Sequence, residues 1–60
     1  MKTVVIIDDH EMMRSGLAAR LENRWHIAGS AASLEEARIL FESLTKAPDL
    51  VLLDIELGKE

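Results

Sequence analysis

The chain has 60 residues, a formal net charge of −4 and no cysteine, and these properties exclude several classes of protein. A chain this short buries only about 60% of the surface that its unfolded form exposes, so its core is small. Disulfides cannot reinforce that core. The seven Lys and Arg residues are scattered, so we expect this segment to bind no nucleic acid. No stretch approaches the ~20 apolar residues of a membrane span, which predicts a soluble, cytoplasmic chain without membrane contact.

Two short aliphatic runs predict strands, and both end in acids. Residues 4–7 read Val-Val-Ile-Ile and precede Asp8 and Asp9, whereas residues 50–53 read Leu-Val-Leu-Leu and precede Asp54. Neither run alternates with polar residues, which is typical of parallel strands covered on both faces in α/β proteins. We therefore expect two buried strands, of which the one before Asp54 is the more buried.

The first intervening segment has the period of a helix. From about residue 11 to residue 22, apolar side chains recur every four positions at Met13, Leu17 and Leu21. Gly16 in the middle of this helix costs roughly 1 kcal/mol relative to alanine, which favours close packing of the helix on the sheet.

The next segment predicts a strand followed by a second helix. Residues 25–30 alternate loosely, which favours a short strand at an edge of the sheet. Ser33 and Glu36 have the spacing of a capping box, which starts a helix. The apolar stripe of this helix is expected at Leu34, Ala37, Phe41 and Leu44, and Pro48 lies beyond its end. The order is β-α-β-α-β, and the strand order decides whether the helices cover one face or both.

The carboxyl ends of parallel strands meet at one edge of a sheet, which would bring Asp8, Asp9 and Asp54 together. Three carboxylates repel one another unless a cation lies among them, and Mg²⁺ prefers oxygen ligands. An aspartate beside such a cation can attack phosphorus and form an acyl phosphate. Asp54 is the candidate nucleophile.

Other interpretations of these residues stay open. An aspartate after a strand often caps a helix or forms a turn, which applies to Asp8 and Asp9 individually. His10 is interpreted as a surface or first-turn residue, because imidazole suits softer metals than Mg²⁺. A Mg²⁺-dependent phosphatase with an aspartate nucleophile is an alternative, although it needs an acid two residues after a strand-end aspartate, where this chain has His10. No glycine-rich turn favours a nucleotide site.

The motifs at residues 4–10 (Val-Val-Ile-Ile-Asp-Asp-His), 14–17 (Arg-Ser-Gly-Leu) and 47–54 (Ala-Pro-Asp-Leu-Val-Leu-Leu-Asp) resemble the first half of a bacterial two-component response-regulator receiver domain. They are most similar to receivers attached to LuxR-type helix-turn-helix output domains. The resemblance implies an α/β fold, a truncated flavodoxin-like β-α-β-α-β unit with three parallel strands in order 2-1-3 and two helices. It implies that residues 1–60 form one partial receiver domain, without strands four and five.

The resemblance also implies a role for each matching residue. Asp54 matches the phosphoacceptor, which takes a phosphoryl group from a sensor histidine kinase. Asp9 matches the acid that binds Mg²⁺ directly, and Asp8 matches its neighbour, which acts through water. Glu56 matches the residue whose backbone carbonyl is a further metal ligand. Such a module is a switch in a phosphorelay rather than an enzyme, and its parent protein would regulate transcription by binding DNA through the missing output domain.

The chain departs from the family after its third strand. The family's Thr or Ser after strand four and its Lys after strand five have no counterpart here, and the third strand would be an unpaired edge. We therefore expect a fragment that associates with itself through this edge. The alternative is a purely structural, self-associating half-domain without phosphoryl-transfer activity.

Overall fold

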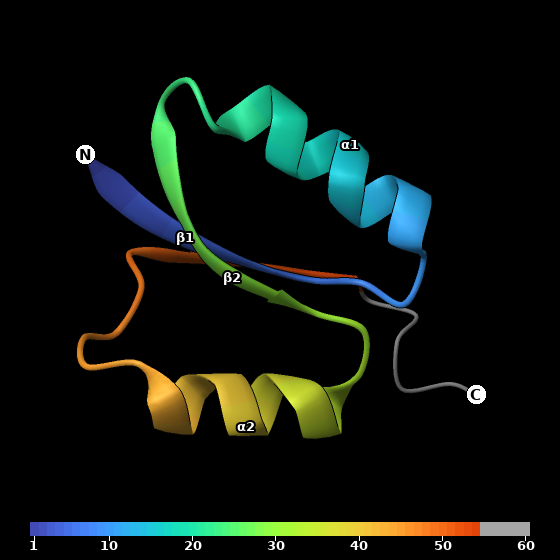
Figure 1. The fold of residues 1–60 in the computed structure, drawn as a ribbon, viewed down its shortest axis with the longest axis vertical. Helices are drawn as coiled ribbons and strands as arrows, with labels where there is room; N and C mark the ends of the chain where they lie inside the picture. The colour runs from blue at the N-terminus through green and yellow to red at the C-terminus, as the bar shows by residue number, and fades with distance from the viewer. Residues whose placement is uncertain (55–60) are drawn as a thin grey trace.

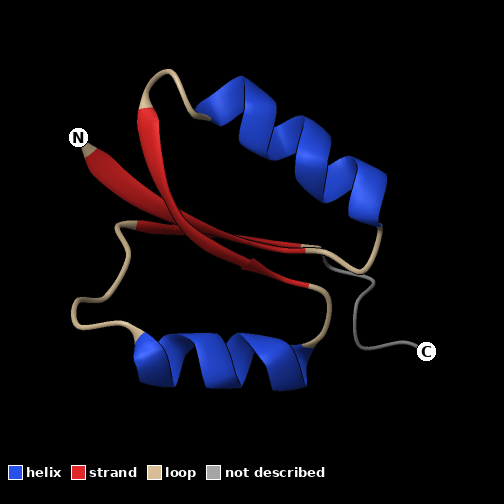
Figure 2. Ribbon diagram, viewed as in Figure 1, coloured by secondary structure: helices blue, strands red, loops and turns tan. Residues whose placement is uncertain are grey.

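Five elements alternate along residues 1–54, which are the part of the chain that the computed structural model describes. They are β1 (Lys2–Ile7), α1 (Glu11–Leu21), β2 (Trp25–Ala31), α2 (Leu34–Ser43) and β3 (Leu50–Leu53). The strands form a parallel sheet in the order β2-β1-β3, which confirms the expected α/β class and its 2-1-3 order. The two helices lie on opposite faces of this sheet (Figure 1, Figure 2). Neither of them is long and apolar enough to cross a membrane.

β1 is the centre of the core. Its residues Val4, Val5 and Ile6 are fully buried, because β1 has a strand on each side and a helix on each face. The expectation that β3 is the most buried strand is wrong, since Val51 is 40% and Leu53 is 52% exposed. Within residues 1–54, β3 pairs only with β1, and the helices make their main contacts with β1 and β2. An aliphatic run therefore lies at an open edge of the described sheet.

α2 begins as its sequence predicts. The Oγ of Ser33 accepts a hydrogen bond from the backbone N–H of Glu36 at 3.1 Å. The Glu36 carboxylate reaches back in turn, and its Oε1 accepts from the backbone N–H of Ala32 at 3.0 Å. The second bond goes to the residue before the N-cap rather than to the N-cap itself, so it ties the helix to the end of β2.

The apolar stripe of α2 differs from the expected one. Ala37 is buried against β1 and β2, and Leu40 and Leu44 pack beside it. Leu34 is 55% and Phe41 is 38% exposed. The spacing of three and four residues was correct, but the face in contact with the sheet is centred on Ala37 and Leu40.

The pairing of β2 with β1 contains an irregularity. Ile27 pairs with Val4, but the next pair joins Gly29 to Val5, so that one extra residue of β2 lies between them. Such a bulge reverses the alternation of side chains that follow it. This is why the sequence of β2 alternates only loosely.

Close packing of a helix on the sheet occurs at Gly29 rather than at Gly16. A Cβ atom added to Gly29 would lie 2.7 Å from Cδ1 of Leu40, whereas one added to Gly16 would meet no atom within 4 Å. The expectation that Gly16 allows α1 to pack closely on the sheet is therefore wrong, because no described residue of the sheet lies close to it. A side chain at position 29 would therefore require the Leu40 side chain of α2 to shift.

Both ends of β3 are fixed to β1. At its start, Oδ2 of Asp49 accepts a hydrogen bond from the Thr3 backbone N–H at 2.8 Å, and the Asp49 N–H donates to the Thr3 carbonyl at 3.0 Å. The bond from Thr3 lowers the pKa of the Asp49 carboxyl, because it stabilises the ionised form. At its end, the Asp54 N–H donates to the Ile7 carbonyl at 3.0 Å. These bonds set the register that positions Asp54.

Candidate functional site

The backbone pairing of the sheet continues one residue beyond the strands and places two of the acids. The Asp8 N–H donates to the Ala31 carbonyl at the end of β2 at 3.0 Å, just as the Asp54 N–H donates to Ile7. Both aspartates are therefore held at the carboxyl edge of the sheet by main-chain hydrogen bonds. The strand order therefore brings their main chains to the same edge.

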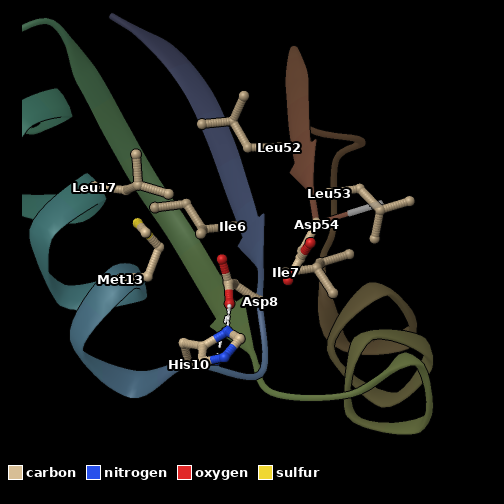
Figure 3. Close-up of a pocket in the computed structure, with 9 residues that line it drawn as sticks. All are labelled: Ile6, Ile7, Asp8, His10, Met13, Leu17, Leu52, Leu53 and Asp54. Atoms are coloured by element: carbon tan, nitrogen blue, oxygen red, sulfur yellow. Dashed lines mark hydrogen bonds and ion pairs between the residues drawn. The ribbon is translucent and has the colours of Figure 1, made fainter. Parts of the chain in front are cut away.

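Four side chains at this edge lie close together. One ligand atom from each of Asp8, Asp9, His10 and Asp54 can be chosen so that all four atoms lie within 4.8 Å of one another. Asp8 is buried, Asp9 and Asp54 are partly buried, and His10 is exposed. Figure 3 shows the Asp8, His10 and Asp54 side chains around one opening. The structure thus brings together the three acids singled out from sequence, while Glu56 lies outside the described residues.

The Asp9 carboxylate has an oxygen that the described residues do not satisfy. Its Oδ1 is buried and has no hydrogen-bond partner. The atom lies 2.9 Å from Nδ1 of His10, which is an ion-pair distance without hydrogen-bond geometry. A buried carboxylate oxygen without a donor is costly unless a cation or water completes its surroundings. The unsatisfied oxygen of Asp9 is compatible with a cation bound among the acids.

His10 lies against both neighbouring acids. Its backbone N–H donates to Asp8 Oδ1 at 2.8 Å, and its Nδ1 lies 3.2 Å from the same oxygen. The hydrogen bond with Asp8 raises the pKa of the His10 imidazole, and the charge of Asp9 raises it further. The ring is exposed, as expected for a first-turn residue, but its contact with the acids was not evident from sequence because it depends on the turn into α1.

Arg14 is a residue of this region to which the sequence assigned no role. Its Nη1 donates to the backbone carbonyl of Asp8 at 2.6 Å. This bond joins the first turns of α1 to the end of β1, because Arg14 lies within α1. It holds the main chain of Asp8 in place and brings a positive charge to the acidic edge. The only sequence indication was that Arg14 belongs to one of the three motifs.

An apolar hollow of about 440 Å³ adjoins the acids on the α1 side of β3. Its wall is formed by apolar side chains of α1, β1 and β3, and Asp8, His10 and Asp54 lie at the same opening (Figure 3). The apolar members are Ile6, Ile7, Met13, Leu17, Leu52 and Leu53. Charges beside such a wall are screened less than in bulk water. The acids are therefore in a setting that strengthens their interaction with a cation.

The chemistry open to this site follows from its donor atoms. Carboxylate oxygens are the ligands that Mg²⁺ prefers, and Mg²⁺ commonly uses one or two of them together with water or phosphate oxygens. The buried, unsatisfied Oδ1 of Asp9 and the short distances among the acids fit such an ion. A carboxylate beside a divalent cation can also serve as a nucleophile toward phosphorus. Asp54, at the end of β3, brings a carboxylate to this cluster.

No curated protein and no solved structure matches the chain. The family model described as the response regulator receiver domain matches residues 4–60, which is nearly the entire sequence. The strand order 2-1-3, with a helix on each face, is the fold expected for the first half of that domain. The chain therefore belongs to the response regulator receiver domain family.

Proposed function

We propose that Asp54 accepts a phosphoryl group from the phosphohistidine of a sensor kinase, with Mg²⁺ bound among Asp8, Asp9 and Asp54. Receiver domains are phosphoacceptors in two-component systems, and membership of this family supports the general role. The observation that carries the specific proposal is the approach of the three carboxylates to within 4.8 Å at the carboxyl edge of the sheet.

Three side chains and one backbone group would hold the ion. Asp9 would bind it directly through the Oδ1 that lacks a hydrogen bond, and Asp8 would act through water. Asp54 contributes a carboxylate oxygen, and the Glu56 carbonyl is proposed as a further ligand. Mg²⁺, when bound, neutralises charge on the phosphoryl oxygens and orients them for in-line transfer.

The transfer itself is a displacement at phosphorus. A carboxylate oxygen of Asp54 forms the new P–O bond while the P–N bond of the phosphohistidine breaks. The histidine nitrogen keeps the electron pair of that bond and takes a proton from solvent. The product is an acyl phosphate on Asp54, and its effect is a shift between two conformations rather than repeated turnover.

A small phosphodonor tests this proposal without the kinase. The chain is incubated with acetyl phosphate in Mg²⁺ and, in parallel, in EDTA, and its intact mass is measured. We expect an increase of one phosphoryl group in Mg²⁺ and no increase in EDTA, because the three acids repel an incoming phosphoryl group when no cation is present. Equal labelling in both conditions would contradict a cation-dependent site.

We further infer the context of the parent protein. The Asp-Asp-His sequence of residues 8–10 and the Arg-Ser-Gly-Leu sequence of residues 14–17 are most similar to receivers with LuxR-type output domains. Residues 1–60 would then form the partial receiver domain of a cytoplasmic transcription regulator that binds DNA through its output domain. A coding sequence that continues into a different output domain would contradict this inference.

A second proposal concerns the open edge of β3, which we propose pairs with the β3 edge of a second copy. Within the described residues β3 has no partner on that side, and its Leu50, Val51 and Leu53 are 37%, 40% and 52% exposed. Two such edges related by a two-fold axis pair in antiparallel orientation and cover these side chains.

Leu53→Lys is expected to convert the associated species to monomer, because it places a charge on the exposed apolar edge strand. Multi-angle light scattering measures the effect. Ile39→Lys is the matched control, since Ile39 is 54% exposed on α2, and it should leave the mass unchanged. A monomeric wild-type chain would contradict the proposal. Association without any phosphoryl uptake, with or without Mg²⁺, would favour the purely structural alternative.

A further inference from the structure

We propose that Asp49 is a positioning residue for phosphoryl transfer to Asp54, although it lies at the opposite end of β3 from the acids. Its carboxylate holds the start of β3 against β1 in one register, and this register decides where Asp54 lies. The inference rests on the proposed role of Asp54 as phosphoacceptor. It gives a part in that reaction to a residue outside the acidic edge.

The sequence of β3 does not define its own register. The strand consists of four aliphatic residues, Leu50–Leu53. Register is normally set by the pattern of apolar and polar side chains, and a uniform aliphatic run has no such pattern. Helix packing adds little, because the helices make their main contacts with β1 and β2. Another interaction is therefore needed to select the observed pairing of Val4 with Leu50.

Asp49 and Thr3 supply this interaction directly before the paired residues begin. The Thr3 backbone N–H donates to Oδ2 of Asp49 at 2.8 Å, and the Thr3 hydroxyl donates to the same oxygen at 3.3 Å. In the other direction, the Asp49 N–H donates to the Thr3 carbonyl at 3.0 Å and lies 3.2 Å from Thr3 Oγ1. A shift of one residue would place Pro48 or Leu50 opposite Thr3, and neither has a carboxylate. These contacts therefore exist in one register only.

The charge of the carboxylate strengthens these contacts. The hydrogen bond from the Thr3 backbone lowers the pKa of the Asp49 carboxyl, and the nearby charge of Lys2 also lowers it. Hydrogen bonds to an ionised acceptor are stronger than those between neutral groups. Asparagine at position 49 would keep an acceptor oxygen without the charge, whereas alanine would remove the acceptor. The two substitutions should therefore weaken the hold on β3 to different degrees.

A change of register would remove Asp54 from the acidic cluster. One residue of a parallel strand spans about 3.3 Å, and a shift by one residue also turns each side chain to the other face of the sheet. The ligand atoms of the cluster lie within 4.8 Å of one another, so such a shift is large compared with the site. Misplacement of a reacting group by about 1 Å can cost roughly 100-fold in rate. Asp49 therefore acts on the reaction only through the position of Asp54.

Amide hydrogen exchange measured by NMR tests the hold on β3 in wild type, Asp49→Ala, Asp49→Asn and the control Glu22→Gln. The readout is the exchange rate of the Asp54 N–H, which is bonded to β1, relative to that of the Asp8 N–H, which is bonded to β2. We expect Asp49→Ala to raise this ratio roughly tenfold, as for the loss of one hydrogen bond, and Asp49→Asn to raise it less. Glu22→Gln removes an exposed charge at the end of α1 and should leave the ratio unchanged.

The rate of phosphoryl uptake tests the consequence for the reaction. The same four chains are incubated with acetyl phosphate and Mg²⁺, and the initial rate of the increase in intact mass is measured. We expect slower uptake in Asp49→Ala, partial recovery in Asp49→Asn and the wild-type rate in Glu22→Gln. Recovery in the conservative variant would follow the exchange ratio, because both depend on the same hydrogen bond.

The outcomes separate this inference from the proposed function. Equal exchange ratios in wild type and Asp49→Ala would overturn the hold on β3, and so would equal acceleration of both amides, which indicates a loss of overall stability. A raised ratio with unchanged phosphoryl uptake would overturn the positioning role. If Asp49→Ala does not fold, Asp49→Asn decides the same comparisons. Absence of uptake in the wild-type chain would overturn the proposed function and with it the part of Asp49 in the reaction, whereas the exchange ratio would still test the hold on β3.

Discussion

Replacing Ile6 with alanine is expected to remove a large part of the stability of the chain. Ile6 is fully buried in the central strand, between β2 and β3. Truncation of a buried isoleucine costs about 2–5 kcal/mol through lost burial and the cavity left behind. A folded chain has roughly 0.05–0.15 kcal/mol of stability per residue, so a chain of 60 residues has on the order of 3–9 kcal/mol. The substitution therefore removes much of the free energy of unfolding.

Urea unfolding followed by circular dichroism measures this loss. Ile39→Ala is the matched control, because the same side chain is removed from α2, where Ile39 is 54% exposed. Surface substitutions usually change stability by only about 0.5 kcal/mol. Equal unfolding midpoints of the two variants would contradict the central position of β1 in the core.

Replacing Asp9 with asparagine is expected to weaken Mg²⁺ binding severely. The substitution removes the charge of the carboxylate whose Oδ1 is buried without a hydrogen bond, and it leaves a weaker amide ligand in the same place. Loss of an outer-shell partner alone costs roughly 10–100-fold in metal affinity, so loss of a direct carboxylate ligand should cost at least as much. Calorimetric titration with Mg²⁺ measures the change.

Glu11→Gln is the control for the general effect of charge. Glu11 is exposed at the start of α1, two residues from Asp9, and its substitution removes the same charge from the same region of the surface. Solvent screens an exposed charge, so we expect a small change in affinity. A similar loss in both variants would show that Mg²⁺ responds to the negative field of the surface and not to a defined ligand.

The acidic edge could be predicted from sequence because it depends on strand order. Parallel strands that end in Asp8 and Asp54 place these residues at one edge however their side chains pack, and the backbone bonds to Ala31 and Ile7 show the same arrangement. The capping box at Ser33 is equally local, since its first hydrogen bond spans three residues.

Features that depend on contacts between elements were not predictable. Val51 and Leu53 are exposed because β3 is an edge strand of the described sheet and the helices pack mainly on β1 and β2. The aliphatic sequence of β3 does not show which neighbours cover it. The close approach of α2 to Gly29 depends on how a helix packs against a strand that precedes it in the chain, and sequence reasoning assigned close packing to Gly16 instead. The contact of His10 with two acids depends on the turn into α1.

The intact mass of the wild-type and Asp54→Asn chains, after incubation with acetyl phosphate and Mg²⁺, tests the proposed role of Asp54 most directly. Glu22→Gln is the control, because Glu22 is an exposed carboxylate at the end of α1 that lies away from the acidic edge, and the folding of both variants is checked by circular dichroism. We predict one phosphoryl increment in the wild-type chain and in E22Q, and none in D54N. An increment in a folded D54N chain, or none in a folded wild-type chain, would contradict Asp54 as the phosphoacceptor.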